Sequence, residues 1–444
     1  MKRFIILCAA FLCVLTASAE LIKDGFVEYV PNFVKHTASI YFLDFAEVKQ
    51  EVYSIPASVQ YEGEEYVVTA INESALKNGR RNIICTKIIL PPTITVIGKA
   101  AFREFMNVKE IVLPPQLEEI KSSTFAQCTS LETVVLPEGL KSIGEHAFLN
   151  CKALTALALP SSVTFIGSHA FDQTSIKELV LPEGMNVIPQ GACANMRKLQ
   201  NISIPSAVTQ IEGNAFAYCE RLSEVVLPPH LLSIGNAAFQ GCASLTQISL
   251  PQQVQVINVQ AFSECPELKQ MNFPGGIRFI GREAFKSCAN LEAVSFAGAL
   301  PPTISFSAFD FTKLSNVIVP KNCAKRYKEA GDGAYTPFAD ITVTETEDEP
   351  DVSLLLSVVE DVHKRLSAPR ESDRDETLIV QKYIELYDFL APNVNSVDNV
   401  QKVFSIQQLF NNNPYQVIKK PLAKELKSAK TPESILAAFS KYLQ

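Results

Sequence analysis

Residues 131–151 read LETVVLPEGLKSIGEHAFLNC, and this stretch contains every position of a unit that recurs along most of the chain. Leu131, Val134 and Leu136 fit a short strand whose side chains alternate between the core and the solvent. Pro137 then ends the strand, because proline cannot donate the next ladder hydrogen bond. The unit therefore begins with one short strand.

The second half of the unit supplies the filling of a coil. Leu140 and Ile143 are expected to face inward on the return leg. Ala147 permits close approach where the coil turns, and Phe148 fills the middle with the largest apolar volume of the unit. Each coil thus contributes one rung to a stack.

Phenylalanine recurs at the register of Phe148 in steps of 23 residues, except for one step of 22 and one of 24. The positions are Phe102, Phe125, Phe148, Phe171, Phe216, Phe239, Phe262, Phe285 and Phe309, with Cys193 in the one missing register. Fixed periods of about 20 to 29 residues mark leucine-rich solenoids, in which each unit buries its face only by stacking on neighbours. We therefore predict a leucine-rich-repeat solenoid, β-rich with short parallel strands in each coil.

The unit resembles the BspA-like bacterial surface-antigen type of leucine-rich repeat, over roughly residues 50–340. That family's pattern is Leu-x-x-Val-x-Leu-Pro-x-x-Val-x-x-Ile-Gly-x-x-Ala-Phe-x-x-Cys. The register of Gly144 departs from it in other units, so this position does not strictly require a left-handed backbone. Its occupants there are Lys121, Pro189, Glu212, Asn258 and Ser305. The resemblance implies an adhesin or a host-interaction protein of a bacterium.

Both ends of a solenoid must be covered, since an open rung exposes core and unpaired backbone. We assign residues 20–70 to an N-terminal capping region. Within it, Val52–Ile55 and Tyr66–Ile71 flank a turn around Gly63, which predicts a hairpin. The solenoid with its C-terminal cap is assigned to residues 71–344.

The C-terminal cap is expected to close the stack with a helix and loop over Asn322–Tyr335 and a last strand over Phe338–Thr344. An acidic run, residues 345–351, follows and is interpreted as a solvated linker. The 23-residue period ends here. Residues 345–444 are assigned to a separate domain.

This last domain is predicted to be a C-terminal all-α helical bundle. Apolar residues recur at helical spacing within 355–366 and 378–390. Further helices are expected to start near Val397, Pro414 and Thr431, the last with threonine as the cap and proline in the first turn.

The first residues indicate export. Two basic residues precede the apolar run Phe4–Leu15, and Ala17 and Ala19 match the small residues before a signal-peptidase cut. We predict that residues 1–19 are a signal peptide cleaved after Ala19. The run is too short for a membrane span, and no transmembrane segment is expected later. The protein is predicted to be secreted or at the cell surface, with the periplasm as the alternative.

Composition and motifs argue against several classes of protein. The formal net charge of −7 gives no basic footprint for nucleic acid. No recognised catalytic, phosphate-binding or dinucleotide-binding motif occurs. We therefore expect a protein that is not an enzyme, with no catalytic residues and no cofactor.

Six cysteines share one register, three residues after the phenylalanine: Cys128, Cys151, Cys219, Cys242, Cys265 and Cys288. Disulfides between adjacent rungs are one interpretation, because the Cα separation would allow them. Phe105, Thr174, Met196 and Thr312 occupy the same register elsewhere. The site thus accepts any small or apolar group, which favours free buried thiols.

His146 and His169 lie in identical registers of adjacent units, with Glu145 beside them. A metal pair is one interpretation, but zinc needs four ligands, or three plus a water. Equivalent positions in other units form a mixed set, expected to be exposed, without a third histidine. A solvated surface pair is therefore preferred and no metal site is predicted.

The outward side of the strands is the candidate binding surface. Its later flank is apolar in the first half of the array, at Ile89, Val112, Val135, Ala158 and Val180. The earlier flank adds Glu110, Thr133 and Glu178. In the second half the later flank becomes mostly polar, as at Ser203, Ser249, Asn272 and Ser295. An exposed apolar stripe indicates a contact surface, although β-branched residues also simply suit strands.

We therefore expect an exported interaction protein that binds a protein ligand, such as a host matrix or surface protein, through this strand face. The alternative is a glycan-binding protein, or a periplasmic scaffold that docks through the helical domain.

Overall fold

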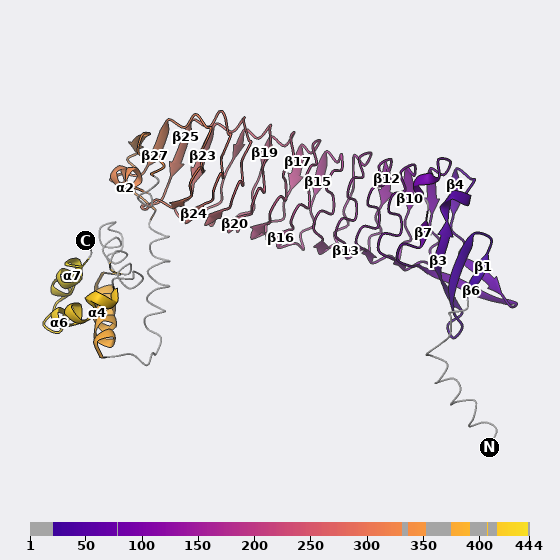
Figure 1. Ribbon diagram of the computed structural model, residues 1–444, viewed down its shortest axis with the longest axis horizontal. Helices are drawn as coiled ribbons and strands as arrows, with labels where there is room; N and C mark the ends of the chain where they lie inside the picture. Colours follow the sequence, from indigo (N-terminus) through magenta and orange to yellow (C-terminus); the bar gives the residue numbers. More distant parts are fainter. Residues whose placement is uncertain are drawn as a thin grey trace, which may run out of the picture.

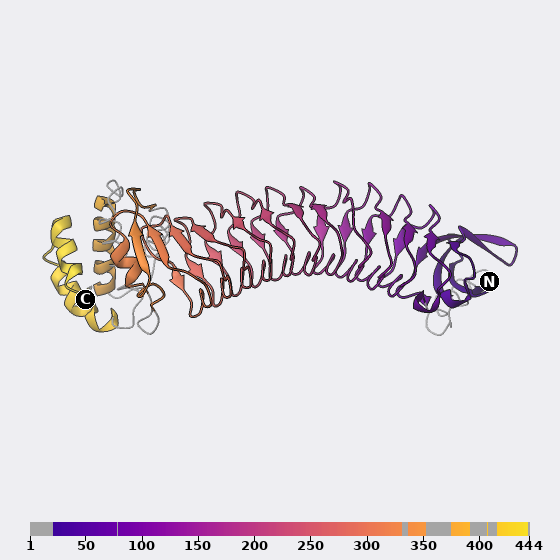
Figure 2. The same ribbon diagram turned by 90° about the horizontal axis from the view of Figure 1, so that it is seen from above.

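The computed structural model describes residues 21–77, 79–330, 336–351, 374–390, 406 and 415–442. The predicted signal peptide and the helices expected within 355–366 and near Val397 lie outside the described residues. The repeats form an elongated, gently bowed stack of coils (Figures 1 and 2). The predicted leucine-rich-repeat solenoid is confirmed.

One row of parallel strands runs along the stack, upper in Figure 1. Each strand pairs in register with the equivalent residues of a neighbouring coil, as Glu110 does with Thr133. The row comprises β4 (Val52–Ser54), β8 (Lys87–Ile89), β10 (Glu110–Val112), β12 (Thr133–Val135), β15 (Glu178–Val180), β17 (Asn201–Ser203), β19 (Glu224–Val225), β21 (Gln247–Ile248), β23 (Gln270–Phe273), β25 (Ala293–Phe296), β27 (Asn316–Val319) and β28 (Thr342–Glu345). We call its outward side the strand face.

A second row of two-residue strands lies on the opposite edge (Figure 1). It comprises β9 (Val96–Ile97), β11 (Glu119–Ile120), β13 (Ser142–Ile143), β14 (Phe165–Ile166), β16 (Val187–Ile188), β18 (Gln210–Ile211), β20 (Ser233–Ile234), β22 (Val256–Ile257), β24 (Phe279–Ile280) and β26 (Thr303–Ile304). Ile143 faces the core, as predicted, but it also belongs to this row. The sequence predicted the inward direction of Ile143 but did not identify this second strand, because two residues are too few to leave an alternation pattern.

The third side of each coil is built from turns with a left-handed backbone at two positions. In the quoted unit these are His146, with φ 56°, and Asn150, with φ 62°. Gly144 is not among them, as predicted. A Cβ on Gly144 would instead lie 2.6 Å from the backbone nitrogen of Ser122, so the residue is needed for close approach of two coils.

The core is a column of stacked rings bordered by thiols. The ring centroid of Phe148 lies 5.3 Å from that of Phe125 and 6.1 Å from that of Phe171. All nine cysteines in the described part of the chain are buried and free, in agreement with the predicted packing role. The Cys151 thiol donates to the Phe125 carbonyl in the preceding coil at 3.2 Å. A disulfide would remove this donor, which explains why the thiols stay free.

The N-terminal cap is a sheet in the order β1 (Ile22–Asp24), β2 (Val27–Asn32), β3 (Thr37–Asp44), β6 (Glu64–Ile71) and β5 (Ser58–Tyr61), with the short β7 (Leu76–Lys77) beside β3. The predicted hairpin exists, but β5 is its first strand. Assigning Val52–Ile55 to the hairpin was wrong. Residues 52–54 form β4, which pairs in parallel with β8 and starts the strand face.

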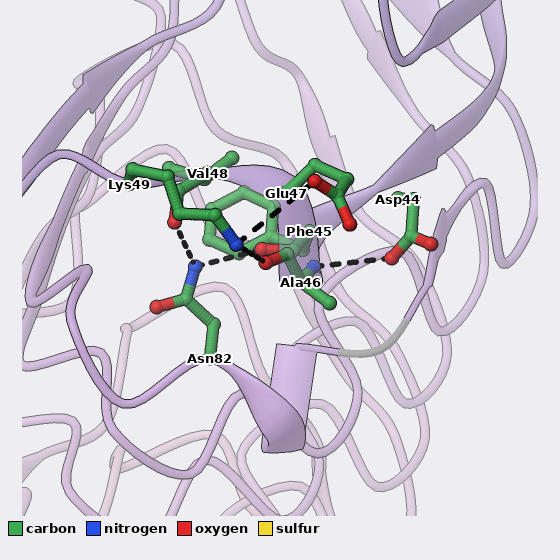
Figure 3. Close-up of polar contacts among 7 residues, drawn as sticks. All are labelled: Asp44, Phe45, Ala46, Glu47, Val48, Lys49 and Asn82. Carbon is green, nitrogen blue, oxygen red and sulfur yellow. Dashed lines mark hydrogen bonds and ion pairs between the residues drawn. The ribbon is translucent and has the colours of Figure 1, made fainter.

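Asn82 joins this cap to the first repeats (Figure 3). It follows the 3-10 turn η3 (Gly79–Arg81), and its side-chain amide donates to the carbonyls of Phe45 and Val48 at 2.7 and 2.9 Å. Phe45 lies in a second turn, η2 (Phe45–Glu47). The Asn82 side-chain oxygen accepts from the backbone nitrogens of residues 84 and 85, both at 2.8 Å. One buried side chain thus satisfies four backbone groups from two segments.

The C-terminal cap contains the predicted helix, α2 (Ala324–Lys328), and ends in β28. The last strand begins at Thr342, and Phe338 is instead a buried turn residue. The acidic run is not a free linker, because Asp351 bonds Ala297 and Ala299 through its backbone at 2.8 and 3.1 Å. Its side chains are mostly exposed, as expected, but its backbone is fixed on the solenoid.

The described residues after 351 include three helices: α4 (Arg374–Leu390), α6 (Tyr415–Leu426) and α7 (Pro432–Ser440). Buried residues from all three pack together, among them Ile379, Leu422 and Phe439. The predicted entry of the last helix is confirmed, with Thr431 as cap in a reciprocal capping box.

Candidate interaction surface

The predicted apolar stripe lies on the outward side of the strand face but projects unevenly. Val135 and Val180 are 71% and 68% exposed. Ile89 and Val112 are only half-buried positions of β8 and β10, and Ala158 is exposed. The accessible apolar surface therefore centres on the coils of β12 and β15.

These two valines flank an interruption of the strand row. Residues 154–159 are all described and form no strand, so one sheet ends at β12 and the next begins at β15. The outward residues of the interrupted coil are Ala156 and Ala158, the smallest side chains that carry a Cβ. Because a large neighbour is missing between them, Val135 and Val180 project further than the other predicted apolar residues.

The polar residues on the earlier flank differ in their availability. Glu110 forms an ion pair with Lys87 at 2.7 Å, and Glu178 accepts from Asn201 at 3.2 Å. Thr133 is exposed between them. The carboxylates are already engaged with neighbouring coils, and exposed pairs of this kind contribute only about 0–1 kcal/mol to stability.

The second half of the strand face is tied by similar contacts between neighbouring coils. Ser295 donates to Asn272 at 2.7 Å, and Gln247 donates to Glu224 at 3.2 Å. Val226 is the exception, with 84% of its surface exposed. This valine shares the register of Val135 but lies among polar neighbours, so it offers a matched comparison.

His146 and His169 are brought together as predicted, with ring centroids 5.3 Å apart and planes 9° from parallel. His169 also contacts the Asp172 carboxylate at 3.0 Å. Their register is not the exposed set that was expected: its occupants are half-buried or buried, because each lies in the left-handed turn. Within the described ranges, no group of three or more potential metal-ligating side chains occurs.

The second strand row also carries exposed apolar residues that the sequence argument missed. Phe165 is 57% exposed and points outward from β14. In the sequence, Phe165 is marked only by its place directly before Ile166, the isoleucine that recurs at this register in most coils. Residues of many types occupy the position of Phe165 in other coils, so the sequence offers no reason to select it. Among the described residues, no helix is long and apolar enough to cross a membrane.

Parallel coils of about 23 residues, a central column of phenylalanine and two rows of short strands define a leucine-rich-repeat solenoid. This class generally serves as a binding scaffold. The BspA type leucine rich repeat region matches residues 69–199 and 209–330, in six copies. These ranges cover more than half of the chain, and the chain belongs to this family.

The chain is similar to several solved structures of bacterial proteins. A leucine-rich repeat protein from Bacteroides ovatus has a TM-score of 0.52 at 23% identity, covering 73% of this chain and 76% of that chain. A leucine rich cell surface protein from Faecalibacterium prausnitzii has a TM-score of 0.46 at 23% identity, covering 73% and 98%. The pneumococcal vaccine antigen PcpA has a TM-score of 0.48 at 17% identity, covering 75% and 100%. No curated protein matches the chain.

Proposed function

We propose that this protein is exported and binds a protein ligand, such as a host surface or matrix protein, through the strand face. The contact surface comprises the apolar stripe, from Ile89 to Val180, and its polar flank of Glu110, Thr133 and Glu178. Residues 1–19 act as the signal peptide in this proposal. Membership of the BspA type family supports a role in interaction.

One observation carries the proposal: two valines about 70% exposed stand on either side of a coil that presents only alanines. Large apolar side chains that project beyond small neighbours bury surface when a complementary partner docks, at roughly 25 cal/mol per Å². Both valines are carried by coils packed into one stack, so we expect little loss of backbone conformational entropy on binding.

The test uses the chain from Glu20 to Gln444 on arrays of purified matrix proteins and of glycans. The variant Val135→Glu/Val180→Glu places two charges on the apolar stripe. The matched control is Val226→Glu, at the same register of a later coil and even more exposed. We expect the double variant to lose binding to a protein on the array by at least about tenfold, while the control and circular dichroism remain unchanged.

Two results would contradict the proposal. One is protein binding by the double variant that equals binding by the control. The other is binding of glycans alone. A further truncation separates the scaffold alternative: deleting residues 352–444 keeps the docked acidic segment, and a strand-face ligand is expected to bind the truncated chain. Loss of binding on this deletion would instead place the contact in the helical domain.

A further inference from the structure

The one 22-residue step of the repeat leaves a hollow at a corner of the stack. Between the thiol register and the first inward strand residue, a normal coil has two residues, as in Cys151-Lys-Ala-Leu154. The following coil has one, Ser175, between Thr174 and Ile176. The shortened corner is recessed between its neighbours, leaving a hollow of about 530 Å³.

Every side chain that lines this hollow is polar or cationic. The seven residues are Lys152, Gln173, Thr174, Ser175, Asn195, Arg197 and Lys198. The stems of these side chains form most of the accessible lining. Their ends offer amides, the Ser175 hydroxyl and cations, which suit a ligand that carries hydroxyl and anionic groups.

The cations lie on both sides of the recessed corner. Lys152 belongs to the preceding coil, and Arg197 and Lys198 belong to the following one, two rungs or about 10 Å further along the stack. Within the described residues, neither lysine forms an ion pair, whereas Arg197 is held by Glu220 at 2.6 Å. Two separated positive groups match a ligand with two separated anionic groups better than a single anion.

Two buried polar atoms at the corner have no hydrogen-bond partner. Thr174 is 3% exposed, and its hydroxyl is unsatisfied; the side-chain oxygen of neighbouring Asn150 is unsatisfied as well. In other coils the thiol at the Thr174 register donates to a carbonyl of the preceding coil. Unsatisfied buried groups are costly and call for a partner. The Thr174 hydroxyl has no accessible surface, so this unsatisfied group lies in the core beneath the shortened corner and is not offered to a ligand in the hollow.

We propose that this hollow binds an acidic oligosaccharide, with anionic groups on successive sugars held by Lys152 on one side and by Arg197 and Lys198 on the other. Gln173, Ser175 and Asn195 hydrogen-bond the sugar hydroxyls between them. Asn195 is oriented for this role, because its amide nitrogen donates to Asp172 at 3.0 Å. The site lies where coils enter the strand face and is distinct from the apolar stripe.

The test measures binding of a heparin-derived tetrasaccharide to the chain from Glu20 to Gln444 by calorimetry. Chitotetraose, a neutral oligosaccharide of the same length, and tetraglutamate are the comparison ligands. We expect Lys152→Ser/Lys198→Ser to weaken tetrasaccharide binding at least about tenfold. The matched control, Lys269→Ser, removes an exposed lysine three coils along and is expected to bind as the parent does.

Two further variants keep the lysines and change the hollow itself. Ser175→Ala removes a hydroxyl of the lining and is expected to weaken binding about threefold or more without loss of stability. Inserting one alanine after Thr174 restores the normal corner, fills the hollow and is expected to abolish binding. If the insertion unfolds the corner, the lysine and Ser175 variants still decide the proposal.

The proposal is overturned if the tetrasaccharide binds no better than chitotetraose, or if the double lysine variant binds it as the Lys269 control does. Equal binding of tetraglutamate, lost in the same variants, would assign the hollow to acidic peptides instead of saccharides. Because Val135→Glu/Val180→Glu leaves the hollow intact, its effect on tetrasaccharide binding separates this site from the strand face.

Discussion

Replacing Asn82 with alanine should detach the N-terminal cap from the repeats. The substitution removes four hydrogen bonds, two to the carbonyls of Phe45 and Val48 and two from the backbone nitrogens of Ile84 and Cys85. Ile84 is 44% exposed, so water can replace the bond to its nitrogen. Three buried groups remain without partners, at about 1 kcal/mol or more each. We expect the free energy of unfolding of the cap to fall by about 3 kcal/mol.

The loss should be local, because each coil of a solenoid contacts only its neighbours. Hydrogen exchange followed by mass spectrometry measures this directly: amides of η2 and β3 should lose protection, while amides of the coils around Phe239 and Phe262 keep theirs. Urea unfolding of the same variant gives the magnitude. The control is Asn107→Ala, whose amide donates a single bond, to the Asn82 carbonyl at 2.7 Å.

The conservative variant Asn82→Asp separates the hydrogen bonds that Asn82 accepts from those that it donates. A carboxylate still accepts from the two backbone nitrogens but cannot donate to the two carbonyls, and it repels them. Stability should therefore recover partly as the pH falls and the carboxyl group becomes a donor. Two results would refute the role of Asn82 in joining the cap to the repeats. One is a decrease in the free energy of unfolding of less than about 1 kcal/mol in Asn82→Ala. The other is a loss of hydrogen-exchange protection that is even along the stack.

Three further outcomes are expected from the thiol column. In the chain from Glu20 to Gln444, Ellman's reagent at pH 8 should react only slowly with the thiols of the folded protein. After unfolding without reductant it should react with all nine thiols, and fewer than nine would show that some cysteines are paired. Burial raises the pKa of Cys128, Cys193 and Cys242 to about 12 from 9.0, so stability is complete below pH 9 and falls as the pH rises toward 12. Cys242→Ala should flatten this decline in urea titrations, and an unchanged slope would contradict the assignment. Thr174→Cys should add a hydrogen bond from the new thiol to a carbonyl of the preceding coil and raise the free energy of unfolding by about 0.5–1 kcal/mol. A decrease in the free energy of unfolding would contradict the presence of an available carbonyl in that coil.

The repeated part of the fold could be predicted from the sequence because one residue type solves the same packing problem in each coil. Phe148 stacks between equivalent rings, so its register was visible at once. The left-handed turn at His146 was not visible, because a backbone bond between coils holds it and many side chains are accepted there. Side-chain periodicity reports packing, and it says little about contacts made by the backbone alone.

The two ends of the solenoid show the same limit. Val52–Ile55 and Ser58–Tyr61 both have strand-like composition, and only the open edge of β8 decides that the first of them pairs there. The acidic residues after Glu345 predicted exposed side chains correctly. Their backbone nevertheless bonds the solenoid up to Asp351, since charge patterning carries no information about main-chain partners.

The outward direction of the candidate site residues could be predicted from the sequence, but the exposed fraction of each side chain could not. Two-residue alternation shows that Val112 and Val135 both point outward, whereas Val112 is half-buried and Val135 projects. The difference arises from the neighbours, in particular the alanines of the interrupted coil. A register argument treats each coil alone and therefore cannot rank exposure along the row.

Both proposed sites lie in neighbouring coils that depart from the regular stack, one by a missing strand and the other by a missing residue. The interrupted strand row presents Ala156 and Ala158, and the same coil supplies Lys152 to the hollow at the next, shortened corner. Packing alone favours a uniform stack, because a missing residue or strand leaves backbone and hydroxyl groups unsatisfied, as at Thr174. Departures that the core does not require are therefore the positions where a solenoid can carry recognition. Independent effects of the valine and lysine variants would establish two separate sites on these coils, whereas coupled effects on one ligand would show that the apolar stripe and the hollow form a single surface.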